Sequence, residues 1–167
     1  EIDRLLSQGK TIMILAVDGQ AAGITAAQDP IKPTAKQAID AMKRLGLEVA
    51  MITGDNKQTA NAIGQQLGID RIFAEVLPQD KASYVKKLQD EGKFVAMVGD
   101  GVNDAPALAQ ANIGIAIGAG TDVAIETANV VLMKSDPTDI LRAIKLSKAT
   151  VTKMKQNLFW ASIYNLL

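Results

Sequence analysis

The feature that most constrains the fold is an alternation of short apolar segments with amphipathic helical segments across residues 49–133. Short, continuously apolar runs predict strands that are buried on both faces, and the intervening helices predict that neighbouring strands are parallel. The expected strands are 49–52, 72–74, 94–98, 113–117 and 130–133. We therefore expect an α/β protein with a Rossmann-like, doubly wound architecture, in which helices cover both faces of a mostly parallel sheet.

A hairpin and a rigid connector precede this alternation. Residues 11–17 and 21–27 are β-type runs on either side of Asp18-Gly19, a dipeptide that favours a tight turn. Residues 29–33 contain two prolines, the second of which can open a helix. Apolar residues then recur at helical spacing until Gly46, so we expect one amphipathic helix in this interval.

The last segment predicts one long helix, from Asp136 as N-cap and Pro137 as first helical residue to Leu167. Its middle is basic, and its end, 157–167, is uncharged and mostly apolar, with Trp160 near the change. This order is typical of a helix that enters a membrane from the cytoplasmic side. Eleven residues are too few against the roughly 20 that span a bilayer, so only the start of a span is expected. The alternative is a helix docked on its own domain.

Composition excludes several kinds of chemistry. The chain has 167 residues, no cysteine, no histidine and a formal net charge of zero. Disulfides, thiol nucleophiles, histidine acid/base catalysis and Cys/His zinc sites are therefore excluded within the chain, and no overall field attracts nucleic acid. The chain begins at Glu1, and we expect it to be a segment of a longer protein.

Two carboxylates follow the apolar run 94–98, in the stretch Gly99-Asp100-Gly101-Val102-Asn103-Asp104. In α/β sheets, ligands bind where strands end. Mg²⁺ takes one or two carboxylates and completes its shell with water and phosphate oxygens, so Asp100 and Asp104 predict a magnesium site. The alternative is a turn whose Asp and Asn residues cap the next helix.

Two further sequences favour a phosphate site. Thr53-Gly54-Asp55 follows the strand 49–52 and opens a helix, where free amides suit an anion, although capping alone explains these residues too. Lys81 lies in the first turn of a helix opened by Pro78, where a cation opposes the helix dipole. A role beside phosphate explains this placement, and the alternative is a surface lysine offset by Asp80. Together these groups indicate a phosphoryl-transfer site that lacks its nucleophile, for which an Asp is expected.

These motifs resemble those of the haloacid dehalogenase superfamily, in the form used by P-type ATPases. The resemblance rests on Thr53-Gly54-Asp55, on Lys81 and on the stretch 99–106, and it covers residues 29–165. It implies a haloacid dehalogenase fold in which ATP and Mg²⁺ are the cofactors. It also implies that Asp100 binds Mg²⁺, that Asn103 and Asp104 support the metal and the phosphoryl group, and that Lys81 neutralises phosphate charge.

The resemblance also implies roles for residues on both sides of this centre. Thr53, Gly54 and Asp55 would contact the phosphate or nucleotide, and Asp29 resembles the hinge aspartate of the family. The short interval between Asp55 and Asp100 is similar to that of the heavy-metal branch. Tyr164-Asn165 resembles the pair with which copper(I) pumps line their transport path, which implies Cu⁺ as the transported ion.

One family motif is missing: the phosphorylated aspartate lies in a DKTGT sequence, which does not occur here. By the resemblance, the chain is a segment of a copper-exporting pump in the membrane, lies mostly on the cytoplasmic side and works with the pump's other domains. We expect residues 1–28 to end the nucleotide-binding domain, 29–135 to belong to the phosphorylation domain, and 136–167 to form a stalk that leads into the membrane. The isolated chain should be inactive.

Two other hypotheses compete with this interpretation. The first is a soluble phosphatase with Asp18 as its nucleophile, although Gly19 and Gln20 follow where a phosphatase has a second Asp and a Thr. The second is a phosphate-binding module without catalytic activity.

Overall fold

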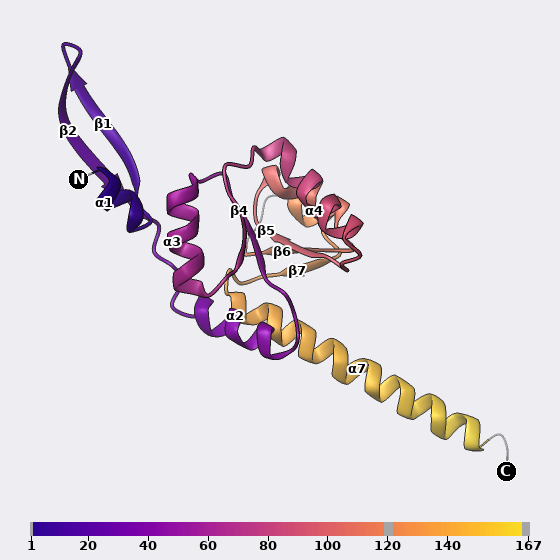
Figure 1. The fold of residues 1–167 in the computed structure, drawn as a ribbon. Helices are drawn as coiled ribbons and strands as arrows, with labels where there is room; N and C mark the ends of the chain where they lie inside the picture. Colours follow the sequence, from indigo (N-terminus) through magenta and orange to yellow (C-terminus); the bar gives the residue numbers. More distant parts are fainter. Residues whose placement is uncertain (1, 119–121, 165–167) are drawn as a thin grey trace.

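The computed structural model describes residues 2–118 and 122–164, which form a projecting hairpin, an α/β body and a long terminal helix (Figure 1). A short helix that the sequence did not predict, α1 (Ile2–Ser7), precedes the hairpin of β1 (Thr11–Val17) and β2 (Gln20–Ala27). The two strands pair antiparallel, with Val17 opposite Gln20. Asp18 and Gly19 have φ values of 50° and 78°, as the predicted two-residue turn requires.

The body contains five parallel strands, as the alternating pattern predicted, and they are divided between two sheets. One sheet pairs β3 (Ala50–Ile52) with β4 (Arg71–Phe73). The other has the order β5 (Ala96–Gly99), β6 (Ile113–Ile117) and β7 (Val130–Leu132). The α/β class and the parallel pairing are confirmed, with two small sheets where the pattern suggested one.

Helices pack around these strands. They are α2 (Ala35–Arg44), α3 (Lys57–Leu67), α4 (Lys81–Asp90), α5 (Ala105–Gln110) and α6 (Asp122–Thr127), with 3₁₀ turns η1 (Pro78–Asp80) and η2 (Val102–Asp104). The apolar face of α2 is buried, and Ile39 meets Leu67 and Ile69 in one core cluster. Gly68 ends α3 with φ 72°, which is the left-handed cap that favours glycine. Val85 of α4 and Leu108 of α5 are fully buried.

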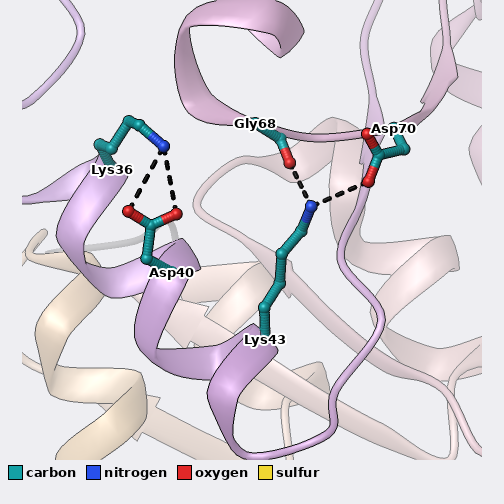
Figure 2. Close-up of polar contacts among 5 residues, drawn as sticks. All are labelled: Lys36, Asp40, Lys43, Gly68 and Asp70. Carbon is teal, nitrogen blue, oxygen red and sulfur yellow. Dashed lines mark hydrogen bonds and ion pairs between the residues drawn. The ribbon is translucent and has the colours of Figure 1, made fainter.

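A lysine joins the end of α2 to the end of α3 (Figure 2). Lys43 Nζ donates to the backbone oxygen of Gly68 and lies 2.8 Å from Asp70 Oδ2. The hydrogen bond from Lys43, together with its positive charge, lowers the pKa of Asp70. These contacts fix the entry to β4 against α2. Figure 2 also shows the exposed pair of Lys36 and Asp40 one turn earlier on α2.

The last helix, α7 (Pro137–Tyr164), extends away from the body beyond α2 (Figure 1). Asp136 is its N-cap, as predicted, because its Oδ1 accepts the backbone N–H of Thr138 at 2.9 Å. The same oxygen accepts the hydroxyl of Thr34 at 2.9 Å, and Lys32 donates to the backbone and side-chain oxygens of Ser135. The connector before α2 therefore holds the start of α7. No helix in residues 2–118 or 122–164 has the length and apolarity that a membrane crossing demands.

Candidate functional site

The centre of the candidate site is the exit of β5, where Asp104 folds back onto Gly99. The chain turns after Gly99, and the N–H of Asp104 donates to the oxygen of Gly101 at 3.1 Å. A Cβ on Gly99 would lie 2.6 Å from the Cβ of Asp104 and 2.9 Å from its Oδ2. A glycine at position 99 is therefore what allows the Asp104 carboxylate to lie at the strand's end.

Lys81 and Asp104, two of the predicted site residues, form an ion pair. Lys81 is the first residue of α4, and its Nζ lies 2.7 Å from Asp104 Oδ1. The two side chains are 19% and 11% exposed, so the pair is largely shielded from water. Asp104 thus explains how a lysine is accommodated at a helix start, where the dipole disfavours a cation.

Asp100 and Asn103 precede Asp104 in the turn after β5, and both are exposed. Within the described part of the chain, no three His, Cys, Asp or Glu side chains converge in a metal-binding cluster. The donor set still fits Mg²⁺, because this ion is commonly held by one or two carboxylates plus water and phosphate oxygens. Asp100, with the neighbouring Asp104, can hold Mg²⁺ in that way.

The Thr53-Gly54-Asp55 loop lies at the exit of β3 and is tied to itself and to the segment after β4. Thr53 Oγ1 donates to Asp55 Oδ2 at 2.7 Å and accepts the Asp55 N–H at 3.1 Å. Asn56 then caps α3, since its side chain accepts the N–H of Thr59. The predicted strand, loop and helix are therefore all present, and the Thr53 hydroxyl is held at the loop.

Sequence reasoning missed the residues that brace this loop. The backbone N–H groups of Glu75 and Val76 donate to the oxygens of Asp55 and Thr53, at 2.8 and 3.0 Å. Glu75 has φ 58°. No residue pattern announces a left-handed glutamate, because this conformation is usually assigned to Gly or Asn. Residues 75–80 then lead along the chain from these hydrogen bonds to Lys81.

Other predicted residues lie away from this centre. Asp29 is exposed in the connector before α2. Asp18 occupies the hairpin turn, as the hairpin prediction placed it, which leaves no structural reason to regard it as a nucleophile. Tyr164 is 83% exposed at the last position of α7, and Asn165 lies outside the described residues.

Comparisons with known proteins found a matching family and similar chains. A family model described as haloacid dehalogenase-like hydrolase matches residues 1–112. The chain is 57% identical over 165 residues to copper-transporting ATPase 1 of Rhizobium meliloti, covering 99% of this chain and 20% of that protein. It is 60% identical over 159 residues to a probable copper-importing P-type ATPase A of Enterococcus hirae, covering 94% of this chain and 22% of that protein.

A comparison with solved structures found a similar fold. A crystal structure of a zinc-transporting PIB-type ATPase in the E2.Pi state matches with a TM-score of 0.80 and 41% identity, over 93% of this chain and 26% of that one. The chain spans about a fifth of the length of the curated relatives described above.

Proposed function

Because the chain belongs to the haloacid dehalogenase-like hydrolase family, we propose that it is the Mg²⁺- and phosphate-binding part of the phosphorylation domain of an ATP-driven copper(I)-exporting P-type ATPase. The names of the relatives from Rhizobium meliloti and Enterococcus hirae support copper as the transported ion. The zinc-transporting structure is less similar in sequence, with 41% identity.

The observation that carries this proposal is the shielded ion pair of Lys81 and Asp104, with the exposed Asp100 four positions earlier at the end of β5. A cation at this position supplies charge for a phosphoryl group that approaches the exit of β5. Asp104 orients the Lys81 ammonium, and Asp100 offers a free carboxylate at the same strand end. Mg²⁺, when bound by Asp100 and Asp104, would offset the charge on the transferring phosphoryl group.

The remaining predicted residues take supporting roles in this proposal. Thr53, Gly54 and Asp55 contact the phosphate or the nucleotide. Asn103 supports the metal and phosphoryl group, and Asp29 belongs to a hinge toward the nucleotide-binding domain. The nucleophile is an aspartate in a DKTGT sequence elsewhere in the parent protein, since none occurs in this chain.

The proposal also assigns the parts of the chain. Residues 1–28 end the nucleotide-binding domain, 29–135 belong to the phosphorylation domain, and 136–167 form a stalk that leads into a membrane helix. The partners of the chain are the other domains of the same pump. Tyr164 and Asn165, which come late in the segment 136–167, would line the copper path.

Labelling with [γ-³²P]ATP and Mg²⁺ tests the function. The full-length protein should form an acid-stable, hydroxylamine-sensitive phosphoenzyme in the presence of Cu⁺, as an acyl phosphate does, and the purified 167-residue chain should form none. Asp100→Asn in the full-length protein should reduce labelling strongly, whereas Asp18→Asn should not change it. A phosphoenzyme on the isolated chain would contradict the proposal. Stimulation of turnover by Zn²⁺ instead of Cu⁺ would contradict the metal assignment.

A further inference from the structure

Glu75 has a backbone conformation that its residue type does not favour. Among the described residues other than glycine, Asp18 and Glu75 alone have a positive φ, of 50° and 58°. The hairpin turn accounts for Asp18, because that turn type requires left-handed residues. Glu75 lies in no hairpin; it follows β4 by two residues, between the strand and η1. Its strained conformation therefore calls for another reason.

The left-handed turn directs two successive backbone N–H groups at the Thr53-Gly54-Asp55 loop. The pairing of β3 with β4 continues for one bond, from the N–H of Thr53 to the oxygen of Phe73 at 2.9 Å. At Glu75 the chain turns, and the N–H groups of residues 75 and 76 donate to Asp55 and Thr53. Three backbone hydrogen bonds thus hold both ends of the loop.

The surroundings of this turn fix its place. The side chain of Val76 is 3% exposed, and a Cβ on Gly54 would lie 3.5 Å from the Val76 oxygen. The loop and the turn are therefore in close backbone contact. The Glu75 carboxylate contributes less: it lies 3.8 Å from Lys57 Nζ, and both side chains are more than half exposed.

The same turn sets the path of the chain to Lys81. From Val76 the chain enters η1, which packs against η2, and Lys81 follows η1 directly. Lys81 then meets Asp104 at 2.7 Å. The left-handed residue Glu75 is therefore hydrogen-bonded to the loop that carries the Thr53 hydroxyl, and it begins the segment that leads to Lys81 at the start of α4.

We infer that Glu75 is a positioning residue, whose left-handed backbone aligns the Thr53 loop with Lys81 so that both act on one phosphoryl group. The inference rests on the proposed function, since it names a further residue for that same site. It assigns the role to the backbone of residue 75 and not to its carboxylate. Residues that tolerate a positive φ should therefore replace Glu75, and a β-branched residue should not.

The test uses the full-length protein in membranes, with orthovanadate and inorganic phosphate as probes of the phosphate site. Glu75→Val should weaken inhibition by orthovanadate about tenfold, since a β-branched residue resists the left-handed conformation. Glu75→Gly and Glu75→Asn should stay within about threefold of the wild type. Lys57→Gln, which removes the ion pair alone, is the matched control and should match the wild type.

One further readout separates positioning from a loss of folding. The amount of phosphoenzyme formed at saturating ATP counts active molecules, and vanadate inhibition is compared per active molecule. Equal vanadate affinity in Glu75→Val and wild type would overturn the inference, as would a glycine variant as weak as the valine variant. If the wild type itself formed no phosphoenzyme, the proposed function would fall and this inference with it.

Discussion

The shielded ion pair of Lys81 and Asp104 should show strong energetic coupling in a double-mutant cycle. The two charges lie 2.7 Å apart. At an effective dielectric constant of about 20, their attraction is about 6 kcal/mol, and desolvation of the two ions offsets several kcal/mol of it. Because water reaches part of each side chain, we expect each single substitution, Lys81→Met or Asp104→Asn, to lower the free energy of unfolding by about 2 kcal/mol.

The double variant should lose no more than either single variant, because it leaves no unpaired charge in the shielded site. Its expected loss is about 1–2 kcal/mol, which gives a coupling energy of about 2–3 kcal/mol. For a chain of this size, each single change corresponds to a fall in Tm of roughly 4–8 °C. Asparagine is the appropriate replacement at 104, since its side chain keeps the shape that fits beside Gly99.

Urea unfolding of the purified chain, followed by far-ultraviolet circular dichroism, measures the cycle. The exposed pair of Lys36 and Asp40, 3.1 Å apart with side chains 55% and 41% exposed, is a matched control. Lys36→Met and Asp40→Asn should couple by only about 0.3–0.5 kcal/mol. If the effects at 81 and 104 added to within about 0.5 kcal/mol, the argument that this pair is shielded and preorganised would be refuted.

Three further predictions concern packing and pH. Gly114→Ala should cost about 1–3 kcal/mol in urea unfolding, because its Cβ would lie 2.7 Å from the backbone oxygen of Leu108, whereas Gly23→Ala meets nothing within 4 Å and should cost nothing. Leu108→Ala should lower the free energy of unfolding by about 2–5 kcal/mol, since Leu108 is 1% exposed. If thermal denaturation gave the variant the same Tm as the wild type, the place of Leu108 in the core would be contradicted. Hydrogen bonds from the Thr138 N–H, the Thr138 hydroxyl and the Thr34 hydroxyl lower the pKa of Asp136 below its ordinary value. The stability that Asp136 contributes to the folded state is therefore present above the ordinary pKa of an aspartate and is lost as the pH falls through the lowered pKa. Between pH 2 and 6, the free energy of unfolding should therefore fall less steeply on acidification for Asp136→Asn than for the wild type. The same pH dependence in both proteins would argue against these hydrogen bonds.

Local signals predicted much of the fold. Asp18-Gly19 specified the hairpin turn, Gly46 marked the end of α2, and the apolar runs located all five parallel strands. Turn chemistry and periodicity act within a few residues, so a single sequence displays them. The position of Lys81 at a helix start predicted a place beside phosphate, which stays a prediction; the pairing of its ammonium with Asp104 was not predicted.

Contacts between segments that are distant in the sequence could not be predicted in the same way. The division of the strands between two sheets depends on which edges pair, and apolar runs do not encode that choice. The left-handed Glu75 carries no residue signal, since ordinary glutamates avoid this conformation. The hydrogen bond of Thr34 to Asp136 joins residues 102 positions apart, so nothing in the local sequence marks it.

The attachment of α7 has a mechanical consequence. The helix contains 28 residues and is therefore about 42 Å long, while Asp136 and Ser135 are fastened to the connector before α2 at one end of it. A rotation of roughly 10° about that joint would carry the far end of the helix through about 7 Å. The Thr34 hydroxyl and the Lys32 ammonium therefore hold the end of the helix about which such a rotation would turn, so a small rotation there becomes a large displacement at the far end.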